Sequence, residues 1–113
     1  MIDSYHFGEM WIEGIRYKND LAILPSRIES NWRRRRGHRL QMEDIISFLD
    51  EIGKIVIIGT GRIGMMKVSD DVINALEKQG ITVIVQPTTE AWKQFNALHD
   101  ADMTVTGMFH LTC

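Results

Sequence analysis

Runs of apolar residues separate a β-rich first third of the chain from a remainder in which strand-like and helical patterns alternate. Short strands are predicted over 6–12 and 15–17, and Leu21–Leu24 is a further apolar run that Pro25 ends. Over 28–32 apolar residues alternate with polar ones, which is typical of a half-exposed strand.

The period of the pattern changes after Leu40. Apolar residues recur at helical spacing over 43–52, which predicts a helix that ends at Gly53. The following segments are predicted to be strand, helix, strand, helix and strand. Their ranges are 54–59, 69–79, 81–85, 87–98 and 103–111, with Ser69 as the cap and Gly80 as the stop of the first of these helices.

The order of these segments predicts an α/β fold. A strand, a helix and a second strand over 55–85 form a unit that pairs its strands in parallel through a right-handed crossover. The leading strands and the closing strand make the predicted sheet mixed. The chain has 113 residues and shows no repeat or linker, so residues 1–113 are predicted to form a single domain.

The amino-acid composition indicates where in the cell the protein is located, but it says little about its function. Apolar residues make up 44% of the chain, but the longest strongly apolar stretch, Ile55–Ile58, is far too short to span a membrane. The first residues show no secretory signal pattern. Cys113 is the single cysteine, which rules out a disulfide within the chain and favours a reducing compartment. We therefore expect a cytoplasmic protein.

Positive charge is concentrated in one segment. The net charge is −2, yet residues 27–39 sum to +5 while 40–113 sum to −5. The candidate interaction residues of this segment are Trp32, Arg33, Arg34, Arg35, Arg36 and His38. The arginines can form a solvated or salt-bridged strand end, or they can bind a protein partner or another copy of the chain. Binding to nucleic acid is less expected, because only one aromatic residue adjoins the arginines.

A glycine motif follows the predicted strand over 54–59. Gly59, Gly61 and Gly64 have the spacing of the dinucleotide-binding fingerprint. That site requires a helix that begins inside the motif and an acidic residue after the next strand, but the helix is predicted from Ser69 and the next strand ends in Gln86. No Gly-Lys-Ser/Thr follows, so a phosphate loop is not predicted either. The glycines then mark a tight strand exit or a cradle for a small anion.

The cradle would lie at the carboxyl ends of the parallel strands, where open α/β sheets bind ligands. Its candidate residues are Gly59, Thr60, Gly61, Arg62, Thr88, Thr89 and Asn96. Thr88 and Thr89 have a second interpretation as helix N-caps.

Short motifs in a fixed order give the chain a family resemblance. They are Trp32-Arg33-Arg34, Gly37-His38, Asp44, Ile58-Gly59-Thr60-Gly61, Gly80-Ile81-Thr82-Val83, Thr89-x-Ala91 and Phe95-Asn96-x-Leu98. In these the chain resembles the small α/β family of the adipogenesis-associated domain proteins, which also contains a mitochondrial complex I assembly factor. The resemblance implies a three-layer α/β/α fold with a central mixed sheet, and an assembly or regulatory role. The resemblance does not imply a cysteine nucleophile in this chain, because the chain has Trp92 and Gln94 where relatives often have cysteine and threonine.

The remaining chemistry is sparse. The four histidines show no metal-ligand spacing, so neither a metal nor a cofactor is predicted, and no Gly-x-Ser-x-Gly elbow is present. His38 is expected to pack against or cap the following helix. The sequence predicts a non-enzymatic binding or assembly-accessory domain that self-associates or binds a protein. The alternative is a small-molecule or anion-binding enzyme with its site at the strand ends.

Overall fold

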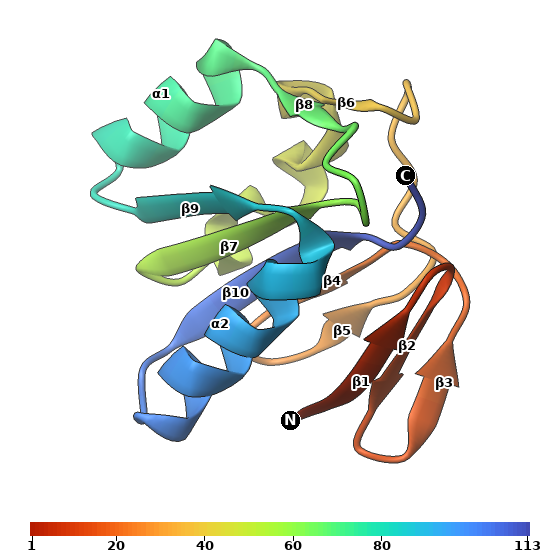
Figure 1. The fold of residues 1–113 in the computed structure, drawn as a ribbon. Helices are drawn as coiled ribbons and strands as arrows, with labels where there is room; N and C mark the ends of the chain where they lie inside the picture. Colours follow the sequence, from red (N-terminus) through yellow and green to blue (C-terminus); the bar gives the residue numbers. More distant parts are fainter.

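A mixed five-stranded sheet forms the centre of the fold in the computed structural model, which describes residues 1–113 (Figure 1). The strands lie in the order β5 (Ile28–Glu29), β4 (Leu21–Ile23), β10 (Val105–His110), β7 (Ile55–Thr60) and β9 (Thr82–Gln86). The last three are parallel to one another, whereas β4 runs antiparallel to β10 and β5 antiparallel to β4. The predicted α/β class and the mixed sheet are confirmed.

One face of this sheet is covered by α2 (Thr88–Asp100) and by an antiparallel three-stranded sheet. The small sheet consists of β1 (Ile2–His6), β2 (Glu9–Ile12) and β3 (Ile15–Tyr17). Phe95 of α2 and Phe109 of β10 pack edge to face with ring centroids 6.0 Å apart, in a core that includes Met10 of β2.

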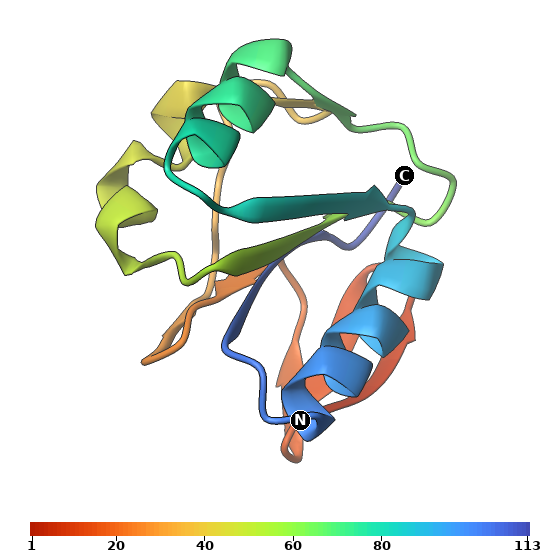
Figure 2. The ribbon, with the colours of Figure 1, turned by 90° about the vertical axis from the view of Figure 1, so that its left-hand side faces the viewer.

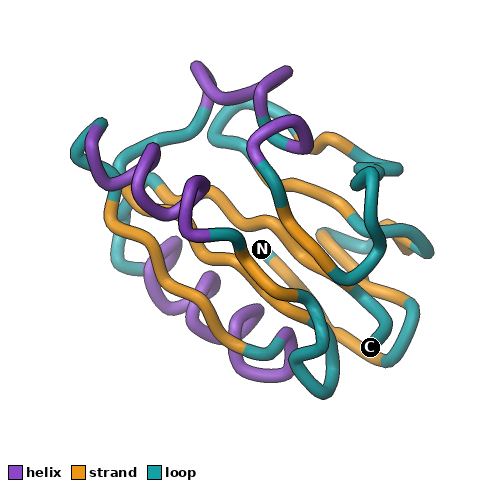
Figure 3. Tube along the Cα trace, turned by 90° about the horizontal axis from the view of Figure 1, so that it is seen from above, coloured by secondary structure: helices purple, strands orange, loops and turns teal.

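The opposite face is covered by α1 (Asp70–Lys78) and by two 3-10 helices, η1 (Met42–Asp44) and η2 (Ile46–Glu51). Two short strands, β6 (Arg39–Leu40) and β8 (Lys67–Val68), pair in parallel beside them. Helices therefore lie on both sides of the strands, as the two further views show (Figures 2 and 3). The three-layer α/β/α arrangement is confirmed.

The strand β7 is central because its sequence is apolar on both faces. Val56 and Ile58 pack with α1, whereas Ile57 packs with α2, and all three are fully buried. Parallel pairing with β9 and β10 aligns the carboxyl ends of three strands at one edge of the sheet. Any site at this edge is built from the residues that follow these strands.

The prediction of a half-exposed strand over 28–32 is wrong beyond Glu29. Asn31 adopts a left-handed conformation with φ of 55°, which a short amide side chain tolerates. The backbone turns there and sends the Trp32 side chain inward, where its indole N–H donates to the Asp44 carbonyl at 2.8 Å. The alternating pattern over 28–32 therefore arises from a turn at Asn31 followed by the buried Trp32, and not from a continuous strand.

The predicted helix over 43–52 forms instead as the two 3-10 helices, with non-helical backbone at Phe48. The carboxylate of Asp44 accepts from the backbone N–H of Gln41 and of Arg35 and so holds a tight turn at the start. The β-branched pair Ile45–Ile46 and the adjoining Ser47 add little intrinsic helix propensity. Tertiary contacts therefore decide the local geometry.

Candidate functional site

Three polar side chains with little exposure meet where β10 ends and β4 begins. Asp20 precedes β4, Arg34 lies in the basic loop (residues 33–39) and His110 ends β10. The Oδ2 atom of Asp20 lies 2.6 Å from Nη2 of Arg34 and 2.8 Å from Nδ1 of His110. The side chains of Arg34 and His110 are 3% and 6% exposed, and that of Asp20 is 17% exposed. A buried ion pair thus ties the basic loop to the carboxyl edge of the sheet.

The carboxylate of Asp20 organises this cluster. Its Oδ1 atom accepts from the backbone N–H of Leu111 at 2.7 Å. A carboxylate only accepts, so the proton on His110 Nδ1 is assigned to the bond with Oδ2. Burial raises the pKa of Asp20, but the hydrogen bonds from His110, Leu111 and Arg34 outweigh burial and leave that pKa below its ordinary value. Asp20 therefore stays ionised in the folded protein at neutral pH.

The guanidinium of Arg34 is fixed on three sides. Its Nε and Nη2 atoms donate to the Gly37 carbonyl at 3.3 and 2.8 Å, and Nη2 also donates to Asp20. The guanidinium carbon lies 5.0 Å from the ring centroid of Trp32. The Nη1 atom is buried and has no hydrogen-bond partner. One end of a buried, oriented cation is thus left with two unused donors.

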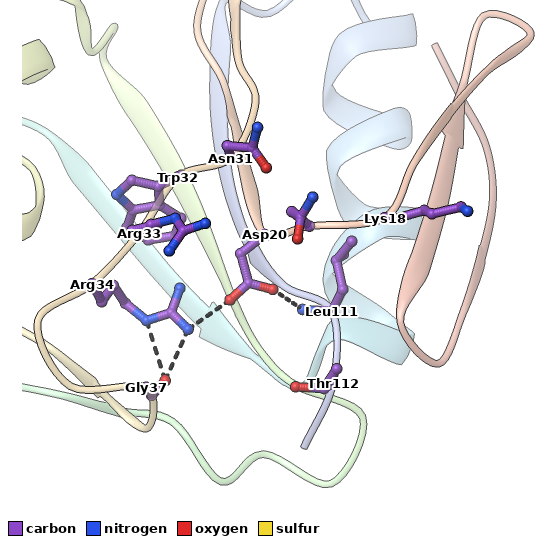
Figure 4. Close-up of a pocket in the computed structure, with 10 residues that line it drawn as sticks. Lys18, Asp20, Asn31, Trp32, Arg33, Arg34, Gly37, Leu111 and Thr112 are labelled. Carbon is purple, nitrogen blue, oxygen red and sulfur yellow. Dashed lines mark hydrogen bonds and ion pairs between the residues drawn. The ribbon is translucent and has the colours of Figure 1, made fainter.

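A hollow of about 410 Å³ opens beside this cluster (Figure 4). Arg33, Arg34, Trp32 and Asp20 line it, together with polar groups such as Asn31. Asp20 is the one carboxylate among the lining residues. The hollow is therefore basic and polar.

The glycine turn after β7 is occupied by contacts within the chain. The Gly61 N–H donates to the Thr88 hydroxyl at 2.9 Å, and that hydroxyl donates to the His110 carbonyl at 2.7 Å. The Arg62 N–H donates to the Thr112 carbonyl at 2.7 Å. Gly61 has φ of 104°, and a Cβ there would overlap the Cys113 carbonyl group. A tight strand exit accounts for Gly61, since its amide joins the end of β7 to α2 and its neighbour Arg62 bonds to the C-terminal residues.

The other candidate residues of the strand ends lie apart from one another. The Thr60 hydroxyl donates to the Gln86 carbonyl at 3.2 Å. Thr89 is the second residue of α2, and Pro87 holds the N-cap position, so neither threonine caps the helix. Asn96 lies about 12 Å further along α2 than Thr88 and pairs with the backbone of Ile2 through both atoms of its amide. A binding role for these residues stays a prediction.

The candidate interaction residues are brought together in one loop, but they differ in burial. Trp32 and Arg34 face inward, whereas Arg33, Arg35, Arg36 and His38 are exposed. The His38 ring packs edge-on to the His110 ring with centroids 5.6 Å apart, and its backbone carbonyl accepts from Lys67. His38 thus packs against the end of β10 and not against the following helix.

Sequence reasoning missed Asp20 and His110 as members of a cluster. Asp20 lies just before β4, and His110 is the last residue of β10. All six residues of β10 are buried in the structure, and a buried histidine needs a partner, but no local pattern in the sequence indicates which residue that partner is.

Comparison with known proteins places the chain among proteins of the same fold. The family described as "Protein of unknown function (DUF498/DUF598)" matches residues 2–110. A conserved hypothetical protein from Pyrococcus horikoshii is 29% identical, with a TM-score of 0.85 over 100% of this chain and 99% of the other. An outer membrane protein from Bartonella henselae is 23% identical, with a TM-score of 0.84 over 99% and 94%. A Bordetella pertussis protein called a Mth938-like domain is 17% identical, with a TM-score of 0.68 over 96% and 84%.

Two further features concern membranes and metals. None of the helices combines the length and the apolar character that crossing a membrane requires. No three or more histidine, cysteine or acidic side chains gather in a way that would hold a metal ion.

Proposed function

This chain belongs to the DUF498/DUF598 family of proteins of unknown function, and we propose that it is a non-enzymatic binding domain that self-associates through its basic loop. Within this loop, Arg35 and Arg36 are the residues proposed to make the contact. The proposal includes the cytoplasmic location expected from the composition. It also keeps the assembly-accessory role that the resemblance to the adipogenesis-associated and complex I assembly proteins implies.

The observation that supports the proposal most strongly is that hydrogen bonds to the rest of the fold hold the backbone of the basic loop in place. The Arg34 side chain is locked to Asp20, the Arg35 N–H donates to Asp44 at 2.9 Å, and the His38 carbonyl accepts from Lys67 at 2.8 Å. These bonds fix the backbone while the side chains of Arg35 and Arg36 face solvent. Little conformational entropy of the backbone would then be lost when the loop binds a partner.

An acidic patch lies directly beside this loop. The pairing of β6 with β8 and the bond from the Ser69 N–H to the Leu40 carbonyl place the start of α1 next to the loop. Asp70 and Asp71 occupy the first turn of α1, and both are exposed. Adjacent patches of opposite charge can pair reciprocally across a two-fold axis, which is the commonest symmetry of protein dimers. The partner proposed is therefore a second copy of the chain.

The contact proposed is largely electrostatic, so it should weaken with salt. The exposed arginines have few partners within the chain: Arg35 reaches Glu43 at 3.3 Å, an exposed pair, and Arg36 makes no ion pair. Pairs of this kind contribute less than about 1 kcal/mol, so they offer little competition to a partner. At 0.5 M NaCl the screening length falls to less than half its value at 0.1 M, and the dimer should dissociate.

Light scattering coupled to size-exclusion chromatography tests the proposal. The wild-type protein at about 100 µM in low salt is expected to have the mass of a dimer, and R35S/R36S and D70N/D71N to have that of a monomer. Arg34 is left in place because its side chain is part of the buried ion pair. The control variant, K54S/K78S, removes the same charge from exposed lysines elsewhere and should remain dimeric. A monomeric wild type, or an R35S/R36S variant of unchanged mass, would overturn the proposal.

A further inference from the structure

We propose that the hollow beside Arg34 binds the phosphate group of a small polar molecule, held between the guanidinium groups of Arg33 and Arg34. This site is separate from the surface used for self-association, because Arg35, Arg36 and Asp70 do not line the hollow. Its position at the carboxyl edge of the parallel strands is one at which open α/β sheets bind ligands.

The first argument is the unused end of Arg34. The side chain is 3% exposed, yet Nη1 donates to no atom of the protein. A buried donor without an acceptor destabilises the fold, and a charged donor does so more than a neutral one. In Figure 4 the Nη1 end of the guanidinium points to the side on which Trp32 and Arg33 lie, away from its bonds to Gly37 and Asp20. An acceptor on that side would satisfy it.

The second argument is the presence of another cation without a partner. Arg33 lines the same hollow, is exposed and makes no ion pair or side-chain hydrogen bond within the chain. Two guanidinium groups on one side of a hollow repel each other unless an anion lies between them. Lys18 lines the rim, although its ammonium group points away from the two arginines (Figure 4).

The third argument concerns Asp20, the carboxylate of the hollow. Both of its oxygens are engaged, Oδ1 by the Leu111 N–H and Oδ2 by Arg34 and His110. The lining residues carry three cations against this one carboxylate, so their net charge is +2. Asp20 therefore holds the Arg34 guanidinium in a fixed orientation without neutralising the hollow.

The geometry selects the class of anion. The edge of Arg34 formed by Nε and Nη2 already donates to the Gly37 carbonyl, so a planar carboxylate cannot take the usual two-point contact there. The free donors are on Nη1 of Arg34 and on the exposed, unpaired guanidinium of Arg33, which belong to two different side chains. A tetrahedral phosphate presents three oxygens and nearly two charges to such donors. The volume of about 410 Å³ leaves room for a small polar molecule attached to the phosphate.

Titration of the ¹⁵N-labelled protein followed by NMR tests the inference. Inorganic phosphate and glycerol 3-phosphate are added separately, with sodium chloride at the same ionic strength as the reference. Both phosphates are expected to shift the backbone amides of Asn31, Arg33 and Thr112 saturably. The R33Q variant should weaken binding about tenfold or more, as loss of a charge-assisted hydrogen bond implies. The matched control R36Q removes a neighbouring exposed arginine outside the hollow and should bind within about twofold of the wild type.

Three results would overturn the inference. The first is a phosphate titration that matches the chloride reference. The second is equal weakening by R33Q and R36Q, which would indicate diffuse attraction to the basic loop. The third is a set of shifts centred on Gly61 and Arg62, which would favour the glycine turn as the anion site. None of these results depends on the mass of the protein, so the inference and the proposed dimer can fail independently.

Discussion

The Asp20→Asn substitution should destabilise the fold by about 3 kcal/mol. Asn keeps an acceptor for the Leu111 N–H but places an amide without charge beside Arg34 and His110, which lose hydrogen bonds of 2.6 and 2.8 Å. Breaking a buried ion pair by removing one partner costs about 3–5 kcal/mol. We take the low end because the Asp20 side chain is 17% exposed and adjoins the hollow, from which water can solvate the remaining charge.

Urea unfolding followed by tryptophan fluorescence measures this loss, since Trp32 is buried and should report the transition. The control is D50N, because Asp50 is exposed and makes no ion pair, and it should change stability by less than about 0.5 kcal/mol. A double-mutant cycle with R34M should give a coupling energy near 2 kcal/mol, within the range seen for residues in one network. A D20N loss below about 1 kcal/mol, or additive single losses, would refute the reasoning.

The same carboxylate predicts a dependence on pH. The folded pKa of Asp20 lies below its ordinary value, so the unfolded chain binds its proton first as the pH falls. The contribution of Asp20 is therefore complete above the unfolded pKa of about 3.9 and is lost as the pH falls through the folded pKa. The stability difference between the wild type and D20N should stay constant from pH 7 to about pH 5 and should shrink as the pH falls below about 4. An unchanged difference would contradict the assignment of the shift to this cluster.

Three further stability predictions can be checked by the same unfolding assay. G61A should lower the free energy of unfolding by about 3 kcal/mol or more, because the added Cβ is both strained at a positive φ and overlaps the C-terminal backbone. The control G8A has a positive φ but open space around it, so it should cost only about 1–2 kcal/mol of strain. Equal losses in the two variants would contradict the close approach at Gly61. T88V should cost about 1–3 kcal/mol by leaving an amide and a carbonyl unpaired, and T88S, which keeps the hydroxyl, clearly less. F95A should cost about 3–5 kcal/mol, while I46A at an exposed position should stay within about 0.5 kcal/mol.

The sequence predicted the central sheet well because its strands follow local rules. The apolar run of β7, the stop at Gly80 and the strand–helix–strand order are read from neighbouring residues, and the structure has each of them. Ser69 holds the predicted N-cap position of α1, but its side chain makes no capping hydrogen bond. The failures occur where distant contacts decide. The segment over 43–52 has a helical period, but it forms 3-10 turns, and the Asp44 carboxylate at its start accepts hydrogen bonds from the backbone N–H groups of Arg35 and Gln41.

The location of the candidate site could be predicted from the sequence, but the residues that form it could not. The carboxyl edge of the sheet follows from the parallel strands, and the arginine segment from charge alone. The cluster that joins them needs Asp20, Arg34 and His110, and Asp20 and His110 are 90 residues apart in the chain. No local pattern distinguishes Arg34 from its three neighbours, because its burial depends on the left-handed turn at Asn31 and on the inward Trp32.

The buried ion pair therefore links the two proposed surfaces. Asp20 fixes Arg34, and Arg34 in turn closes the basic loop through Gly37 and keeps its unpartnered Nη1 atom beside the hollow that Arg34 lines. Loss of Asp20 should release both constraints at once, so D20N should weaken phosphate binding and dimer formation together under conditions in which it remains folded. R33Q and R35S/R36S should each affect one and spare the other. This comparison distinguishes Asp20, which holds both surfaces in position, from Arg33, Arg35 and Arg36, which contact the ligand or the partner directly.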